Sequence, residues 1–272
     1  MRQVAIITGA SEGIGAELAR QMARQHGADL ALVLAARRQD ALQAVAQECE
    51  TFACTVLVQI CDVGEESACR ALIDACITRF GRLDILINNA GVSAHALLED
   101  VHDLQWYQDV MRVNLWGSVW CTHAALPHLK ASRGRIVAVS SLAGLVGVPG
   151  RTAYSASKFA MNGFFEALRI ELKPAGVSVT LAYPGVVATR IRYHGYNAQG
   201  QPAGVSGLKE ENAMRVEECA RLILRGMQAR QRDVVMTFKG KLGRWLKLLL
   251  PGVIENIALA AVKQDMGPKN RA

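Results

Sequence analysis

The stretch TGASEGIG, residues 8–15, decides the fold class, because it joins a buried apolar run to a helical pattern. The preceding run QVAIIT is typical of a strand, and the following GIGAELARQMARQHG is typical of a helix. In such a junction Gly9 permits a sharp turn, Gly13 lets the backbone approach a pyrophosphate, and Gly15 allows close packing of the helix on the sheet. The helix N-terminus offers free N–H groups and a positive dipole end to phosphate. The junction therefore predicts a dinucleotide-binding turn.

The alternation of apolar runs with helical patterns continues along the chain. Strands are predicted over residues 3–9, 28–37, 55–63, 83–91, 135–141, 177–185 and 233–238. Helices are predicted over residues 13–27, 39–50, 65–80, 104–130 and 152–173. Nearly continuous apolar strands separated by helices indicate a parallel sheet that is covered on both faces. We therefore expect one α/β domain over residues 1–272, a doubly wound Rossmann-like fold with a seven-stranded parallel sheet flanked by helices.

The composition narrows the classes of partner. The chain has 272 residues, of which 51% are hydrophobic, and a net charge of +7. A basic balance suits an anionic ligand, a membrane surface or nucleic acid, and it is also common in soluble enzymes. Within the first 200 residues no run of Arg and Lys is interleaved with aromatic residues, so we expect no binding to nucleic acid.

The seven cysteines indicate neither a disulfide framework nor a metal site, because their number is odd and no C-x-x-C pair occurs. We expect no bound metal and a reducing, cytoplasmic setting. The first strand begins at about Val4, too early for a cleavable leader to precede it. No apolar run reaches the roughly 18 residues that a membrane-spanning helix needs.

Tyr154 and Lys158 in AYSASK are four residues apart, which places both side chains on one face of a helix. Alone, this spacing is far more often that of a core tyrosine beside a solvated lysine. The glycine turn, NNAG (88–91), AYSASK and PGVVAT (184–189) nevertheless follow one another in the order typical of the short-chain dehydrogenase/reductase superfamily. The chain resembles that superfamily over about residues 3–190.

The resemblance implies a catalytic set of Asn114, Ser141, Tyr154 and Lys158. Reduction of a ketone develops negative charge on the carbonyl oxygen, which must gain a proton. Tyr154 is expected to supply that proton, and the Lys158 cation favours the phenolate that remains. Ser141, at the family spacing of thirteen residues before Tyr154, is expected to donate a second hydrogen bond to the substrate oxygen. Asn114 is expected to hold a water that resupplies the proton.

The resemblance also implies contacts with a nicotinamide dinucleotide. The expected cofactor-binding residues are Gly9, Ser11, Glu12, Gly13, Ile14, Gly15, Arg37, Arg38, Asp62, Val63, Asn89, Ala90, Gly91, Tyr154, Lys158, Pro184, Gly185, Val187 and Thr189. Ala36 stands where the NAD-dependent members carry an acid, and Arg37 follows where NADP users carry a basic residue. Glu12 would repel a phosphate unless Arg37 or Arg38 pairs with it. We expect NADPH in preference to NADH.

The substrate is expected to be a ketone or secondary alcohol on a hydrophobic, lipid- or steroid-like molecule, because the residues around AYSASK resemble the hydroxysteroid and lipid-ketone branch. Two alternatives are reduction of a 3-oxoacyl thioester and a non-catalytic regulator that binds NADPH. The irregular segment 190–212 is expected to form a substrate lid. By resemblance we also expect a homodimer or homotetramer.

The segment 240–264 is basic and amphipathic at its start, with Leu242 and Trp245 on one face and Lys241 and Lys247 turned away. We expect its apolar face to pack on protein, either at the substrate mouth or on a neighbouring subunit. Peripheral contact with an anionic membrane surface is the alternative.

Overall fold

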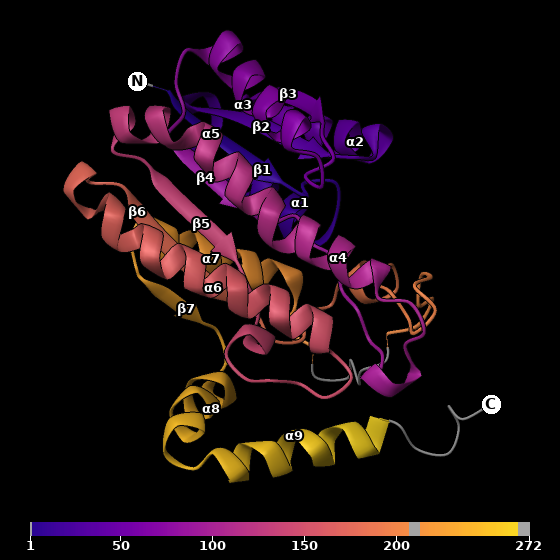
Figure 1. The fold of residues 1–272 in the computed structure, drawn as a ribbon. Coiled ribbons are helices and arrows are strands. Elements are labelled where there is room, and N and C mark those ends of the chain that lie inside the picture. The colour runs from indigo at the N-terminus through magenta and orange to yellow at the C-terminus, as the bar shows by residue number, and fades with distance from the viewer. Residues whose placement is uncertain (1, 207–212, 266–272) are drawn as a thin grey trace.

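The computed structural model describes residues 2–206 and 213–265, and its centre is one parallel sheet of seven strands (Figure 1). The strands lie in the order β3–β2–β1–β4–β5–β6–β7. Their bounds are β1 Gln3–Thr8, β2 Leu30–Ala36, β3 Thr55–Ile60, β4 Ile85–Asn88, β5 Arg135–Val139, β6 Ser178–Tyr183 and β7 Asp233–Val235. The predicted doubly wound, seven-stranded parallel sheet is confirmed.

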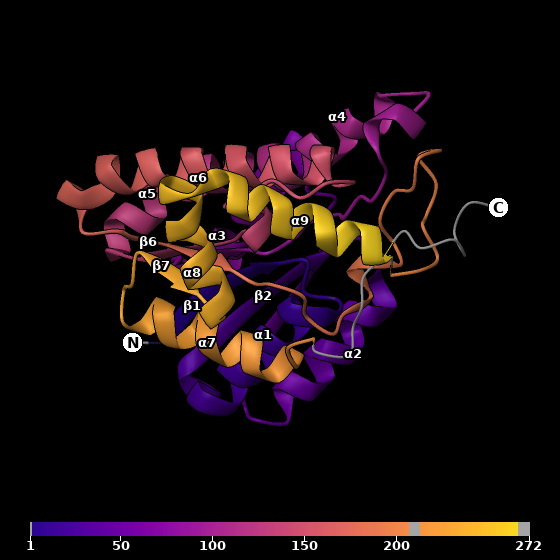
Figure 2. The ribbon, with the colours of Figure 1, turned by 90° about the horizontal axis from the view of Figure 1, so that it is seen from below.

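Helices cover both faces of the sheet because its strands are apolar on both sides (Figure 2). In β1, Ala5 and Ile7 join the core on one face, whereas Val4 and Ile6 join the core on the other. The first face is covered by α1 Gly13–His26, α2 Gln39–Glu50 and α7 Val216–Gln228. The second is covered by α3 Glu66–Phe80, α5 Gly117–Ser132 and α6 Thr152–Leu172.

Three elements differ from the prediction. The long helix predicted over 104–130 is α4, Gln105–Met111, followed by a π-helical stretch, Arg112–Trp116, and then α5. Strand β7 ends at Val235 instead of 238, because the Thr237 hydroxyl accepts a hydrogen bond from the Gly240 N–H and caps the next helix. Helix α7 is absent from the predicted elements, although its apolar residues recur with helical spacing.

The C-terminal segment forms α8, Phe238–Leu249, and α9, Pro251–Asp265, at the edge of the molecule beside β7 (Figure 1). Two basic side chains of helix α8 turn toward the rest of the protein. Arg244 Nη1 lies 2.9 Å from Asp233 Oδ2, and Lys247 Nζ donates to the Leu145 carbonyl at 2.9 Å. Leu242 and Trp245 remain exposed. The expectation that this apolar face packs on the substrate mouth is therefore wrong for the described part of the chain.

Strands β1 and β4 meet where the direction of winding reverses, and Thr8 joins them there. The Thr8 hydroxyl accepts hydrogen bonds from the N–H groups of Asn89, at 3.0 Å, and Ala90, at 3.1 Å. The Asn89 side-chain amide in turn donates to the Thr8 carbonyl at 2.9 Å. In a doubly wound sheet the ligand cleft opens at this reversal. Thr8 thus holds together the two strand ends from which the cleft is built.

Replacing Thr8 with valine should preserve the shape of the side chain but leave the N–H groups of Asn89 and Ala90 without their acceptor. We expect the free energy of unfolding to fall by about 1–3 kcal/mol, the cost of unsatisfied buried donors. Urea denaturation measures this change. Thr55→Val in β3 is the matched control, since valine suits a strand and the described structure gives that hydroxyl no hydrogen bond. Equal stability of the two variants would contradict the assignment.

Candidate active site

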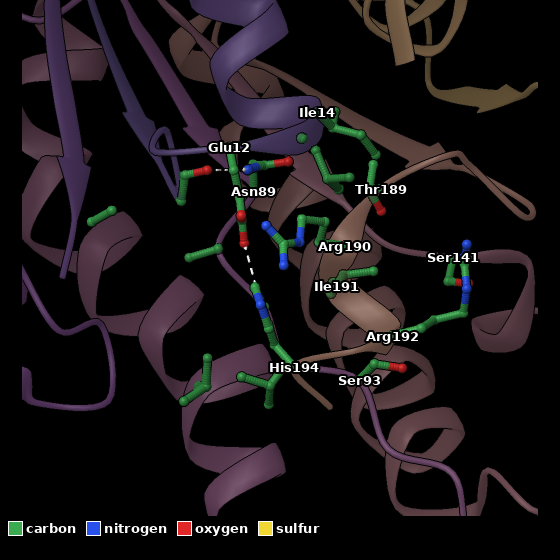
Figure 3. A pocket seen from close by; sticks show the side chains of 18 of the residues that line it. Glu12, Ile14, Asn89, Ser93, Ser141, Thr189, Arg190, Ile191, Arg192 and His194 are labelled. Carbon is green, nitrogen blue, oxygen red and sulfur yellow. Dashed lines mark hydrogen bonds and ion pairs between the residues drawn. The ribbon is translucent and has the colours of Figure 1, made fainter. Parts of the chain in front are cut away.

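A cleft of ≈ 450 Å³ opens at the carboxyl ends of the strands. It is bordered by the turn between β1 and α1, by the residues after β2 to β6, and by the segment that follows Thr189 (Figure 3). Of the predicted site residues, the cleft is lined by Gly9, Ser11, Glu12, Gly13, Ile14, Arg37, Arg38, Asp62, Val63, Asn89, Ala90, Gly91, Ser141, Tyr154, Lys158, Pro184, Gly185, Val187 and Thr189. Gly15 and Asn114 lie behind its wall.

The glycine turn has the geometry of a phosphate cradle. Gly9 and Gly13 have φ angles of +65° and +57°, which residues with a Cβ rarely adopt. A methyl group at Gly15 would collide with the Gly9 carbonyl oxygen, so glycine permits the close approach of helix and strand. No side chain caps the N-terminus of α1 and no acid lies in its first turn. Its N–H groups and positive dipole end fit the phosphates of a dinucleotide.

Paired charges border the end of the cleft near β2. Glu12 Oε2 lies 2.8 Å from Arg38 Nη2, and Glu12 Oε1 lies 3.3 Å from His194 Nδ1 (Figure 3). Arg37 reaches Asp62 only at 4.0 Å, and 70% of its side chain is exposed. Arg38 therefore neutralises Glu12 while Arg37 remains available to a ligand. Because its charge is paired with that of Arg38, Glu12 does not oppose the binding of a phosphate.

Lys158 is a buried cation beside Tyr154. Its Nζ donates to the carbonyl of Val139, the last residue of β5, at 2.9 Å and lies 5.9 Å from the centroid of the Tyr154 ring. The residue is 3% exposed. Burial lowers the pKa of Lys158, and the neighbouring Tyr154 opposes that shift. The four-residue spacing thus places Tyr154 and Lys158 in one wall of the cleft. The alternative of a solvated lysine is wrong, because Lys158 is buried.

Asn114 is fully buried in the π-helical stretch and fastens the loop after β4. Its Oδ1 accepts from the Val92 N–H at 2.8 Å, and its Nδ2 donates to the Val92 carbonyl at 3.0 Å and to Ser157 Oγ at 2.9 Å. A Cβ on Gly91 would lie 3.0 Å from Asn114 Oδ1 and 3.6 Å from Lys158 Nζ. Asn114, Gly91 and Lys158 therefore converge behind Tyr154. The water-holding role expected for Asn114 stays a prediction.

The two serines after β5 have different surroundings. Ser140 donates from its hydroxyl to Asn162 Oδ1 at 2.6 Å and is held within the protein. Ser141 Oγ accepts a hydrogen bond from the Ala143 N–H at 3.2 Å, and its side chain faces the cleft (Figure 3). The Ser141 hydroxyl hydrogen thus remains available to a substrate oxygen.

The segment after β6 borders the mouth of the cleft over its described residues 190–206. Arg190, Ile191, Arg192 and His194 line it (Figure 3). Backbone hydrogen bonds join Tyr196 to Ser93 and His95 in the loop after β4. The remaining part of the predicted lid, residues 207–212, lies outside the described residues.

Sequence reasoning missed Ser93 and Arg151, which also line the cleft. Arg151 Nη2 donates to Ser93 Oγ at 2.6 Å, and its guanidinium carbon lies 4.3 Å from the centroid of the Tyr154 ring. Helical spacing gives no signal for Arg151, because it stands one residue before α6 begins and its backbone is not helical.

Comparisons with known proteins identify the family. The profile of the family described as short chain dehydrogenase matches residues 3–199. The chain is 38% identical over 259 residues to 11-beta-hydroxysteroid dehydrogenase A of Sesamum indicum, covering 93% of this chain and 73% of that protein. It is 46% identical over 186 residues to 11-beta-hydroxysteroid dehydrogenase-like 4A of Arabidopsis thaliana, covering 68% of this chain and 61% of the relative.

A solved structure shares the fold. It is an alcohol dehydrogenase from the archaeon Thermococcus sibiricus in complex with 5-hydroxy-NADP, with a TM-score of 0.72 and 27% sequence identity. The match covers 86% of this chain and 95% of that one.

Proposed function

Because the chain belongs to the short-chain dehydrogenase family, we propose that it interconverts a ketone and a secondary alcohol with NADPH as cofactor. The observation that carries the proposal is the convergence of Ser141, Tyr154 and Lys158 on the cleft that also contains the glycine turn. The similarity to hydroxysteroid dehydrogenases supports a hydrophobic, lipid- or steroid-like substrate.

In this mechanism a bound dihydronicotinamide supplies the hydride. The Tyr154 hydroxyl donates its proton to the substrate oxygen, and the Ser141 hydroxyl stabilises the charge that develops there. The Lys158 ammonium stabilises the phenolate that remains on Tyr154. Asn114 holds the loop after β4 in place and, with Ser157 beside it, supports the path by which the proton is resupplied.

Tyr154→Phe removes the proton donor and leaves the ring in place. We expect turnover of any ketone substrate to fall by about a thousandfold or more, because the variant lacks the acid that the reaction needs. Binding of NADPH should remain within a few-fold of the wild-type value. Absorbance assays of NADPH oxidation and calorimetric titration measure the two quantities. Wild-type turnover by the variant would refute the role of Tyr154.

Preference for NADPH is supported by the charges near β2. Arg37 is largely exposed at the edge of the cleft, and the neighbouring Glu12 is paired with Arg38. A guanidinium matches a phosphate by charge and by its fork of donors. The neighbouring strand end, Ala36, offers no carboxylate to ribose hydroxyls.

Arg37→Asp should shift the cofactor preference toward NADH. We expect the ratio of kcat/KM for NADPH to that for NADH to fall by about tenfold or more, because a charge-assisted hydrogen bond is lost and a repulsive charge is gained. Lys130→Asp, at an exposed position near the end of α5, is the control for the change in net charge. A ratio that is unchanged in Arg37→Asp would count against the assignment.

Two other functions fit the same fold. Reduction of a 3-oxoacyl thioester would use the same residues on another carbonyl, and an NADPH-binding regulator would use none of them for chemistry. Oxidation of NADPH by any ketone excludes the regulator, and a panel that includes acyl thioesters separates the two enzymes. A homodimer or homotetramer, a substrate lid that includes residues 190–206 and a cytoplasmic location remain part of the proposal.

The exposed face of α8 supports peripheral contact with a membrane. Phe238, Trp245 and Leu249 are 80%, 65% and 74% exposed, and Lys239 and Lys241 are exposed beside them. Apolar side chains flanked by cations suit an anionic bilayer surface. Within the described ranges, no helix is long and apolar enough to cross a membrane.

Flotation with vesicles tests this contact. The protein should float with phosphatidylserine-containing vesicles, and the double substitution Trp245→Glu/Leu249→Glu should lower the bound fraction by about tenfold or more, because two apolar anchors are lost. Ile170→Glu is the matched control, since Ile170 on α6 is also 74% exposed. Equal binding by the double variant and the wild type would contradict the proposal.

A further inference from the structure

Arg151 presents a charge to the cleft that the described residues do not neutralise. Its Nη2 donates to Ser93 Oγ at 2.6 Å and its Nε to the Ala94 carbonyl at 3.4 Å. Among the residues that the structure describes, no carboxylate forms an ion pair with it. Burial lowers the pKa of Arg151, Tyr154 opposes that shift, and Arg192 adds to it. A desolvated cation is costly unless an anion meets it.

The position of Arg151 assigns it to the substrate end of the cleft. Arg151 immediately precedes α6 and stands three residues before Tyr154, whereas Lys158 lies within α6, four residues after Tyr154. Lys158 reaches the end of strand β5 at Val139, but Arg151 reaches the loop that follows β4 at Ser93. The two cations therefore flank Tyr154 from opposite directions. A group held by Arg151 would lie beside the reacting carbonyl and away from the glycine turn.

The guanidinium retains donors for a ligand. It carries five N–H bonds, and the described contacts with Ser93 and Ala94 use two of them. A carboxylate accepts paired hydrogen bonds from such a fork and supplies the missing negative charge. Val92, Val113 and Ile191 line the same cleft and suit an apolar remainder of the ligand.

We propose that Arg151 binds a carboxylate on the substrate, so that the enzyme acts on amphipathic keto acids and their hydroxy-acid partners in preference to neutral ketones. This inference rests on the proposed function and narrows its substrate class. Ser93 is a positioning residue in this scheme, since it holds the guanidinium against the Tyr154 ring.

The experiment compares three keto acids, levulinate, benzoylformate and ketostearate, each with its methyl ester. The values of kcat/KM with NADPH are measured for the wild type, Arg151→Met, which keeps the length without the charge, and Arg151→Lys. Arg24→Met is the matched control, since that guanidinium lies 5.4 Å from the Phe52 ring centroid but outside the cleft. Comparing acid with ester across variants cancels the intrinsic reactivity of each carbonyl.

We expect Arg151→Met to lower the ratio of acid to ester kcat/KM by about ten- to a hundredfold, the effect of losing a hydrogen-bonded charge pair. Arg151→Lys should retain part of the preference, and Arg24→Met should retain all of it. Affinity for NADPH and the melting temperature should stay at wild-type values. An equal loss for acid and ester, or a loss of NADPH affinity, would overturn the inference.

A binding measurement distinguishes a failure of this inference from a failure of the proposed function. Calorimetry of the NADP-loaded protein with each acid and ester needs no turnover. If neutral ketones and acids all fail to oxidise NADPH, the proposed function fails, yet tighter binding of the acids that Arg151→Met removes would still support the anion site. Absence of any preference for the acids in binding and in turnover would overturn it.

Discussion

The arrangement of the site depends on the burial of the Lys158 ammonium. A cation that is 3% exposed needs compensation, because transfer from water into the protein is costly. The carbonyl of Val139 at the end of β5 accepts one hydrogen bond, and the Tyr154 ring lies beside the ammonium group. The close approach of Gly91 and Asn114 completes the enclosure. The Lys158 ammonium thus joins helix α6 to the end of strand β5.

The cleft as a whole favours anions. Its lining includes Arg37, Arg38, Arg151, Lys158, Arg190 and Arg192, against the two carboxylates of Glu12 and Asp62. A cavity lined by one sign of charge concentrates ligands of the other sign. The dinucleotide phosphates would meet the cations near the glycine turn and β2. Arg151, beside the Tyr154 ring, would remain for the substrate, in line with an acidic group near the substrate carbonyl.

The sheet and most of the cleft could be predicted from the sequence, because they depend on local patterns. Strand β1 is apolar on both faces, and Gly9 and Gly13 act through their own φ angles. Tyr154 and Lys158 share a face through helical geometry alone. These features depend on neighbours in the chain, which a sequence displays directly.

The remaining features depend on contacts between distant segments. Two basic side chains of α8 face the protein because Arg244 forms an ion pair with Asp233 and Lys247 donates a hydrogen bond to the Leu145 carbonyl. The spacing of residues within the helix does not reveal these distant partners. The importance of Arg151 follows from Ser93 beside it and from the absence of an acid among the described neighbours. The pairing of Glu12 with Arg38 likewise appears only when the turn and the end of β2 are brought together.

The most direct test of the central claim follows one hydrogen atom through the reaction. The protein is incubated with a ketone that it consumes and with NADPH in which both hydrogens at the transferring carbon of the nicotinamide are deuterium, and the alcohol is analysed by mass spectrometry. The account predicts one deuterium on the carbinol carbon for each cofactor oxidised. Alcohol that forms without the label, or cofactor oxidation that yields no alcohol, would contradict it.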